Sequence, residues 1–385
     1  MMKSFRILLA VIIAPFLFGC SSPLDKAEEK AEQMFNEVAA LPYIPGINVA
    51  VADSNGVIWA EGFGYANLED NTPMSPVTKM RIGSVAKVIT TAALMQEVER
   101  GEIDLDADIR TYVPEWPETH AKITIRELAN HTAGVRHYQG DEFASNIQYD
   151  SPLAALQIFK NDPLKFTPGS QYSYSTYGWT LISAAMEAAE GRDFKSIIWD
   201  EVLTPLNMTD TTFDDAVPII TNRQGSYDFV DGDLVNSPAV NSSYKYAGGG
   251  FLATPTDIVK FAMAHATPGF LRAESLSEMF TRGDVSPHGI GWVVGFDRYR
   301  AAFTANPEQA AETLAMMDRH PHTVMHSGGS TGGLTMMILC LDHNRAVALT
   351  KNVGNAPPAD QDQANHFLLA LKTLDIFHNE MDAKN

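Results

Sequence analysis

The sequence predicts an α/β (α+β) protein in which helices flank an antiparallel sheet and a mostly helical domain is inserted in the middle. Strand-like runs occur near both ends of the chain, and an Asn-Gly turn joins two of them. The central part instead has short helical patterns, many turns and few strand signals. We therefore expect a sheet domain formed by residues 24–105 and 246–385, and an inserted helical domain at 106–245.

The composition fits a folded protein that does not bind nucleic acid. Hydrophobic residues make up 45% of the 385 residues and charged residues 19%, which excludes a disordered chain. The formal net charge of −19 disfavours contact with phosphates. Cys20 and Cys340 are the 2 cysteines, and lipidation of Cys20 would leave no internal disulfide. Cys340, in an apolar run, is expected to be a small buried residue.

The N-terminus reads as a lipoprotein signal peptide over residues 1–19. Lys3 and Arg6 precede an apolar run at 7–18 that is too short to span about 30 Å of hydrocarbon. The run ends in Leu-Phe-Gly-Cys, which resembles the bacterial lipobox whose cysteine, here Cys20, is lipidated. We expect a protein facing the periplasm, tethered through residues 20–23, and Ser21 favours the outer membrane. The alternative is ordinary secretion with a chance cysteine.

Capping and turn signals set the first elements. Ser22 followed by Pro23 and Asp25 predicts a helix start, with apolar residues recurring at helical spacing behind it. Residues 47–52 and 57–61 flank an Asn-Gly pair, which suits a tight hairpin.

Similar patterns predict the helices and strands of the rest of the chain. In the middle, residues 151–160 and 177–190 have helical patterns, and a capping signature at 254–257 predicts a helix after the glycines at 248–250. Three further strands are expected near the C-terminus, before an apolar-striped helix from about 360 to 377. Those strands are residues 289–296, 334–341 and 346–351.

Ser84-x-x-Lys87 places a nucleophile and a base on one helix face. Residues three apart lie one turn from each other, so the Lys87 amine can reach the Ser84 hydroxyl. To act as a base, the lysine must have its pKa lowered from about 10.4 toward 7. This requires the ammonium to be destabilised by about 4 kcal/mol relative to the neutral amine. Burial and a polar partner must supply most of this. Tyr174 is the candidate partner, and a phenol beside an ammonium is more easily ionised.

Several motifs in order resemble the serine β-lactamase and penicillin-binding protein superfamily. They are Ser84-x-x-Lys87, Leu-Ala-Asn-His-Thr-Ala-Gly at 128–134, Phe-x-Pro-Gly at 166–169 and His-Ser-Gly-Gly at 326–329. The likeness is to the class C β-lactamase-like branch (S12-type serine peptidases), which includes D-amino-acid peptidases and esterases. Segments 156–181 and 241–254 resemble its mitochondrial serine β-lactamase-like members.

The resemblance implies a β-lactamase/penicillin-binding transpeptidase-like fold and a role for each matching residue. Ser84 would be the acylated nucleophile, Lys87 its activator and Tyr174 the proton shuttle. The backbone N–H groups of Ser84 and Gly329 would form the oxyanion hole. The residues expected to bind substrate are Thr176, His326, Ser327 and Gly328. His131 is expected to tie a loop and Arg81 to form a salt bridge.

Two departures from the family pattern bear on the substrate. Thr176 replaces the asparagine of the family's Tyr-x-Asn motif, so a hydroxyl takes the place of the amide. His326-Ser327-Gly328 replaces the Lys-Thr-Gly of efficient class C β-lactamases. A histidine is mostly neutral at pH 7, so it offers no permanent cation to an antibiotic carboxylate.

We therefore expect a serine hydrolase that cleaves an amide, peptide or ester through an acyl-enzyme, resembling a D-amino-acid peptidase or carboxypeptidase. The alternatives are a true class C-type β-lactamase and a non-catalytic lipoprotein that binds cell-wall peptide. The expected partners are a small-molecule or peptide substrate and the membrane, with no cofactor. No metal is expected either: His320, His322 and His326 alternate, but no nearby cysteine or acidic cluster completes a ligand set.

The lipobox generates one direct test. Cys20→Ser removes the thiol that would carry the lipid, so the variant is expected in the soluble fraction after cell lysis, while the unaltered protein sediments with membranes. Membrane association of the variant at the level of the unaltered chain contradicts the anchor.

Overall fold

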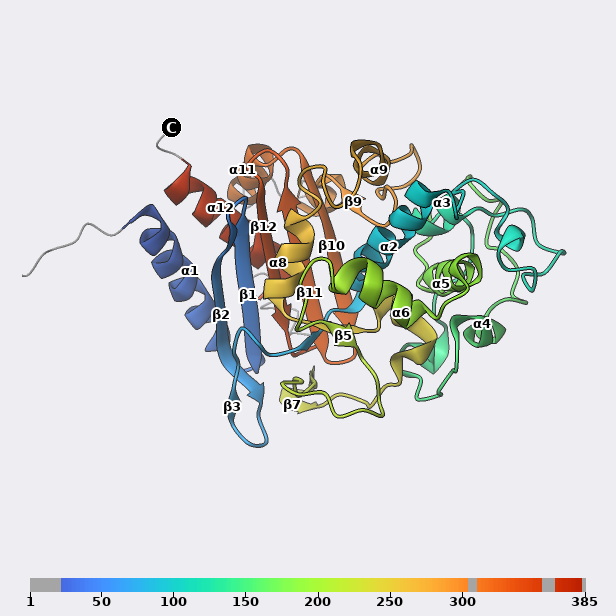
Figure 1. Ribbon diagram of the computed structural model, residues 1–385. Coiled ribbons are helices and arrows are strands. Elements are labelled where there is room, and N and C mark those ends of the chain that lie inside the picture. The colour runs from blue at the N-terminus through green and yellow to red at the C-terminus, as the bar shows by residue number, and fades with distance from the viewer. Residues whose placement is uncertain (1–21, 304–309, 355–363, 383–385) are drawn as a thin grey trace, which may run out of the picture.

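The computed structural model describes residues 22–303, 310–354 and 364–382 (Figure 1). The predicted signal peptide, Cys20 and residues 360–363 of the predicted last helix lie outside the described residues. Within the described ranges, we find no helix that is both long enough and apolar enough to cross a bilayer.

A seven-stranded antiparallel sheet joins the two ends of the chain, in the order β3-β2-β1-β12-β11-β10-β9 (Figure 1). Its strands are β1 (Gly46–Asp53), β2 (Gly56–Asn67), β3 (Thr72–Pro73), β9 (Val293–Val294), β10 (Thr323–Ser330), β11 (Gly333–Cys340) and β12 (Arg345–Lys351). Because β1 pairs with β12, the first long strand lies beside the last one.

Most of the predicted strands are confirmed, and one is largely wrong. β1 and β2 form the expected hairpin, with Asp53 opposite Gly56 and a φ of +115° at Gly56. Of the strand predicted at 289–296, only the two residues of β9 pair with the sheet. Gly291 and Gly295 interrupt it, since their φ values of +78° and +72° lie in the left-handed region, outside the range of an extended strand.

The capping signals are confirmed at two helices. The Ser22 hydroxyl accepts a hydrogen bond from the Asp25 N–H (3.0 Å), and the Asp25 carboxylate accepts one from the Ser22 N–H (2.8 Å). This reciprocal pair starts α1 (Pro23–Ala39). Thr254 likewise accepts a bond from the Asp257 N–H (3.2 Å) at the start of α8 (Pro255–Met263).

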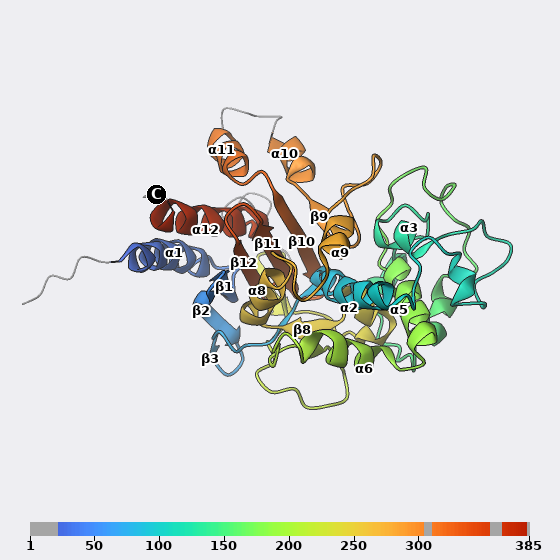
Figure 2. The ribbon, with the colours of Figure 1, turned by 45° about the horizontal axis from the view of Figure 1, so that its top comes forward.

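Helices cover both faces of the sheet, which buries its central strands on both sides. α1 and α12 (His366–Met381) lie side by side on one face, and α8 covers the other (Figure 2). Along β1, Val49 and Val51 belong to the apolar cluster beneath α1 and α12, whereas Ala50 and Ala52 belong to the cluster that contains α8. The fold is the predicted α+β arrangement.

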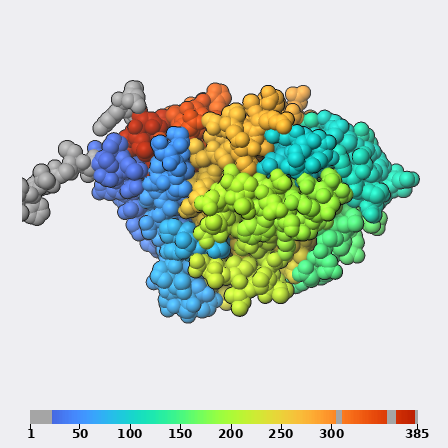
Figure 3. All heavy atoms as spheres, viewed as in Figure 1, coloured from blue at the N-terminus to red at the C-terminus, as the bar shows by residue number. Residues whose placement is uncertain are grey.

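A layer of short helices packs beside the sheet, and the two parts form one continuous body (Figure 3). The remaining helices are α2 (Ala86–Arg100), α3 (Ile125–Ala129), α4 (Pro152–Ala155), α5 (Tyr177–Glu190), α6 (Phe194–Ile198), α7 (Tyr246–Gly249), α9 (Ala273–Met279), α10 (Asp297–Phe303) and α11 (Ala311–Arg319). The minor strands are β4 (Met80–Arg81), β5 (Thr212–Phe213), β6 (Tyr227–Val230), β7 (Asp233–Asn236) and β8 (Phe251–Ala253). α2 packs against α5, α6 and α7, so it joins the sheet to the helical segment.

The sheet and the helical layer meet where β10 touches the turn before α2. A Cβ on Gly328 would lie 1.9 Å from the Ile82 carbonyl oxygen, and one on Gly83 would lie 2.5 Å from the Gly329 oxygen. Only glycine permits backbones to approach so closely. This contact places the 3-10 turn Gly83–Val85, which carries Ser84, directly against the end of β10.

Candidate active site

Ser84 and Lys87 lie within hydrogen-bond distance at the start of α2. The Lys87 Nζ is 3.1 Å from the Ser84 Oγ. Ser84 is partly exposed, whereas the Lys87 side chain is fully buried. A hydroxyl open to substrate therefore has an amine directly behind it, which is the arrangement that nucleophilic catalysis by serine needs.

The Lys87 amine is surrounded by neutral oxygen atoms. Besides Ser84, Nζ contacts the Thr176 Oγ1 at 3.2 Å and donates to the Gly248 carbonyl. Its hydrogen-bond partners among the described residues include no carboxylate. Burial lowers the pKa of Lys87 well below its usual 10.5, and the charge of Lys245 lowers it further. The neutral amine, which can accept a proton from Ser84, is thereby favoured.

Lys245 is a component that the sequence argument missed. Its side chain is 4% exposed, and Nζ donates to the Phe143 carbonyl at 3.0 Å while lying over the Phe143 and Tyr244 rings. Burial lowers the pKa of Lys245 to about 7. The available signal was a lysine between two tyrosines, 244–246, just before the glycine run.

Tyr174 occupies the predicted place beside the pair, but its phenol keeps its proton. Its ring centroid is 5.0 Å from the Lys87 Nζ, and its hydroxyl interacts with the Ser84 side chain. Burial raises the pKa of Tyr174 above its usual value of 10.0. The sequence argument expected an ammonium to make this phenol more easily ionised; the structure gives the opposite direction, because burial of the phenol dominates.

Histidines enclose Tyr174 and fix the segment that carries it. The His131 ring lies 4.3 Å from the Tyr174 ring, centroid to centroid, and its Nδ1 accepts a hydrogen bond from the Ser175 N–H (3.1 Å). His137 Nδ1 accepts one from the Thr176 N–H, also at 3.1 Å. His131 thus ties the loop as expected. His137 was not anticipated, because it carries no motif of its own.

His326 is neutral at physiological pH, in agreement with the sequence argument. It is 3% exposed, and burial lowers its pKa to about 3. Its Nδ1 lies 2.6 Å from the Ser327 carbonyl, and its ring is 5.9 Å from that of His288, a second buried histidine that the sequence did not single out. His326 therefore provides no positive charge.

The two proposed oxyanion donors lie next to each other. A Cβ on Gly83 would lie 2.8 Å from the Gly329 nitrogen, so the Gly329 amide adjoins the Gly83–Ser84 backbone. Thr176 is 2% exposed and contacts Lys87, which leaves it little surface for substrate. Ser327 and Gly328, the remaining predicted residues, adjoin Gly329 in β10. Every predicted site residue except Cys20 therefore lies at this junction of β10 and α2.

A cavity of about 420 Å³ opens beside Gly329. Asp228 is the one charged side chain among its lining residues, which are Phe143, Ala144, Asp228, Val230, Pro238, Gly329, Ser330, Thr331, Leu334 and Gly354. Arg81 does not line it: its Nε lies 2.9 Å from the carboxylate of buried Asp214, the salt bridge that the sequence argument expected. The cavity therefore has a negative rather than a positive charge.

Comparisons with known proteins agree with this geometry. The family model described as Beta-lactamase matches residues 33–371. The human mitochondrial serine beta-lactamase-like protein LACTB is 28% identical over an alignment 406 positions long, which covers 83% of this chain and 73% of that protein. The D-amino acid amidase of Ochrobactrum anthropi SV3 superposes with a TM-score of 0.75 at 19% identity, covering 92% of this chain and 98% of that one. The hydrolase EstCE1 also superposes with a TM-score of 0.75 at 19% identity, covering 91% and 99%.

The buried lysine pair generates a pH prediction. Below pH 7 the Lys245 ammonium opposes protonation of Lys87, so Lys245→Met raises the pKa of Lys87. Because neutral Lys87 is the active form, the acid limb of kcat/KM for a chromogenic ester is expected to move upward by about 0.5 to 1 pH unit. Lys195→Met, which removes another lysine packed over aromatic rings, is the control and leaves the limb in place. An unchanged or downward limb in Lys245→Met contradicts the coupling.

Proposed function

The chain belongs to the beta-lactamase family and is a serine hydrolase, and we propose that it cleaves an amide, peptide or ester bond through an acyl-enzyme on Ser84. The family predicted from the motifs is thereby confirmed. The observation that carries the proposal is the 3.1 Å contact between the Ser84 hydroxyl and the amine of the fully buried Lys87.

In the first step, the Ser84 Oγ attacks the substrate carbonyl carbon while its proton passes to the Lys87 Nζ. The carbonyl oxygen becomes an oxyanion, which the backbone N–H groups of Ser84 and Gly329 would stabilise. A donor of this kind typically contributes about 2.7 to 4 kcal/mol to transition-state stabilisation.

In the second step, the bond from the carbonyl carbon to the leaving nitrogen or oxygen breaks, and the leaving atom takes a proton. The protonated phenol of Tyr174 lies between Ser84 and the His131 and His288 rings, so it is positioned to pass on the proton that Lys87 received. Water then attacks the acyl-Ser84 ester while Lys87 accepts its proton; the bond from the carbonyl carbon to the Ser84 Oγ breaks, and Oγ takes that proton back, which releases the acid and restores the enzyme.

The charges around the cavity favour a substrate with an amine over one with a carboxylate. His326 is neutral, and Asp228 is the one charged side chain among the residues that, with Gly329, line the cavity. An aminopeptidase-like or amidase-like reaction, or hydrolysis of an uncharged ester, agrees better with these groups than a carboxypeptidase reaction does. The name of the D-amino acid amidase fits an amide substrate with an amine.

The two alternatives fit the site less well. A true class C-type β-lactamase needs a cation for the antibiotic carboxylate, and His326 does not supply it. A binding protein without catalysis would have no need for a fully buried lysine beside an accessible hydroxyl, because burying an amine without a carboxylate partner is costly. We propose that the enzyme acts at the periplasmic side of a membrane through lipidated Cys20, on the sequence argument alone.

Loss of the nucleophile provides the primary test. Ser84→Ala removes the oxygen that would be acylated, so covalent labelling by a fluorescent fluorophosphonate is expected to vanish in gel fluorescence. Ser170→Ala, an exposed serine of the 166–170 turn, is the matched control and keeps full labelling. Labelling of Ser84→Ala at the level of the control assigns the nucleophile elsewhere.

Substrate charge provides a second test. Asp228→Asn is expected to lower kcat/KM about tenfold for a D-amino-acid p-nitroanilide with a free α-amine, since one charge pair is worth about 1 to 1.4 kcal/mol at such sites. The N-acetylated analogue, which has no charge, is expected to react equally with both proteins. Asp233→Asn, at the exposed first residue of β7, is the control. Equal losses for both substrates would show that Asp228 does not recognise the amine.

A further inference from the structure

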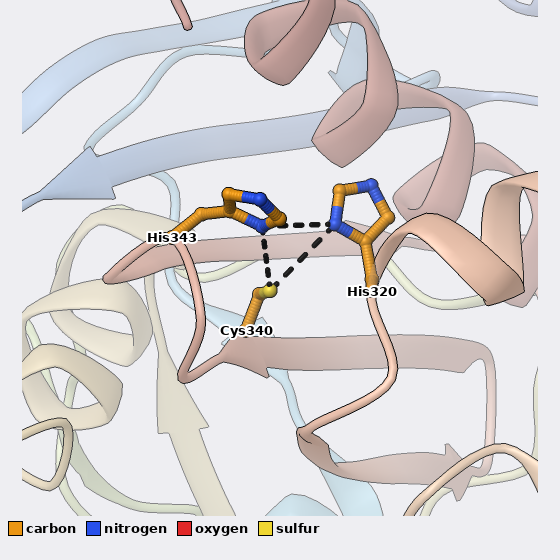
Figure 4. Close-up of side chains that lie close together, drawn as sticks. All are labelled: His320, Cys340 and His343. Atoms are coloured by element: carbon orange, nitrogen blue, oxygen red, sulfur yellow. Dashed lines mark hydrogen bonds between the residues drawn. The ribbon is translucent and has the colours of Figure 1, made fainter.

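Three potential metal ligands meet at the end of the sheet away from Ser84. His320 follows α11, Cys340 ends β11, and His343 lies in the turn before β12 (Figure 4). Their side chains point toward one another (Figure 4). Within the described ranges 22–303, 310–354 and 364–382, these residues form the one group of three or more potential metal ligands that lie close together. β10 separates them from Gly329: its eight residues span roughly 25 Å.

Two of the three distances among these atoms match a tetrahedral zinc site, and the third, 3.1 Å, is shorter than the ideal. Zinc binds histidine nitrogen at about 2.0 to 2.1 Å and cysteine sulfur at about 2.3 Å, so tetrahedral angles put two nitrogens about 3.3 Å apart and nitrogen and sulfur about 3.6 Å apart. Here Nδ1 of His320 and Nδ1 of His343 are 3.3 Å apart. The Cys340 Sγ is 3.6 Å from the first and 3.1 Å from the second.

The outer nitrogen of His320 makes no hydrogen bond, but it faces a carboxylate, the type of group that commonly orients metal-bound histidines. Its Nε2 lies 3.5 Å from the Asp375 carboxylate, which Arg319 holds with two contacts of 2.7 and 2.8 Å. A proton on Nε2 leaves the Nδ1 lone pair directed at Cys340 and His343. Carboxylates in this position orient ligating histidines and increase their basicity.

A cation also satisfies the three converging atoms better than hydrogen bonds do. The thiol of Cys340 has one proton, which cannot serve both imidazole nitrogens at once. When a divalent ion binds, the thiol proton is released to solvent, and the thiolate and two lone pairs become ligands. His378 packs against the same group, with its ring centroid 4.1 Å from that of His343 and 5.3 Å from that of His320.

We propose that Nδ1 of His320, Sγ of Cys340 and Nδ1 of His343 bind a zinc ion, separate from the hydrolase site. The ion links the end of α11, the end of β11 and the turn before β12, three segments that adjoin α12. Its role is structural: it stabilises the outer end of the sheet. The sequence argument found no metal site because it compared His320 with its neighbours along the chain, and the two partners come from the following hairpin.

Cobalt substitution tests the ligand set. Purified full-length protein is stripped with a chelator and titrated with Co²⁺, which occupies zinc sites and gives a thiolate charge-transfer band in the near ultraviolet. One equivalent of Co²⁺ is expected to produce the band, and Zn²⁺ is expected to abolish it. Cys340→Ser and His343→Ala are expected to lose the band. His322→Ala, which alters an exposed histidine paired with Asp342, retains it.

Thermal unfolding provides a second measurement. Excess Zn²⁺ is expected to raise the Tm of the stripped protein by about 5 °C or more and to leave the Tm of both ligand variants unchanged. Labelling at Ser84 reports that each variant is folded. His343 is half-buried, so His343→Ala tests the proposal even where Cys340→Ser disturbs the core. Absence of the band in unaltered protein, or its persistence in either variant, overturns the proposal.

Discussion

The desolvation of a single amine is the constraint on which the rest of the site depends. Lys87 is fully buried among neutral oxygens, and the charge of a second buried lysine, Lys245, lowers its pKa further. Protonation there would place an unpaired cation in a medium that solvates it poorly, which favours the neutral amine that can accept a proton. Residues remote from the reacting atoms, including those that bury Lys245, therefore contribute to the basicity of the catalytic group.

Burial of this kind requires two parts of the fold to close over the start of α2. On the sheet side, Gly328 allows β10 to touch the backbone at Ile82; on the helical side, Gly248 brings its carbonyl to Lys87 and leaves no room for a Cβ beside Thr176. The glycines thus contribute through the side chains they lack. The nucleophile lies at the boundary between sheet and helices because that boundary is where an amine can be enclosed while a hydroxyl remains accessible.

Three histidines in β10 and just before it differ in exposure and in partners because their surroundings differ. His322 is exposed and pairs with Asp342, His326 is buried and neutral next to the catalytic pair, and His320 lies between a carboxylate and a thiol. The three are identical imidazoles within seven positions of sequence. Their different partners come from segments that the sheet and α12 bring to them, so one strand connects a site for acyl transfer at one end with a proposed metal site at the other.

The sequence by itself determined the features that depend on near neighbours: the capped starts of α1 and α8, the β1–β2 hairpin, the order of the motifs and the one-turn spacing of Ser84 and Lys87. It failed where distant segments decide. The strand predicted at 289–296 was interrupted by two left-handed glycines, the phenol of Tyr174 stayed protonated, and Lys245, His137, His288 and the partners of Cys340 were missed. Turns and caps depend on hydrogen bonds between residues a few positions apart, so the spacing of residue types along the sequence reveals them. Ionisation depends on how completely water is excluded, and only the packed tertiary structure determines that.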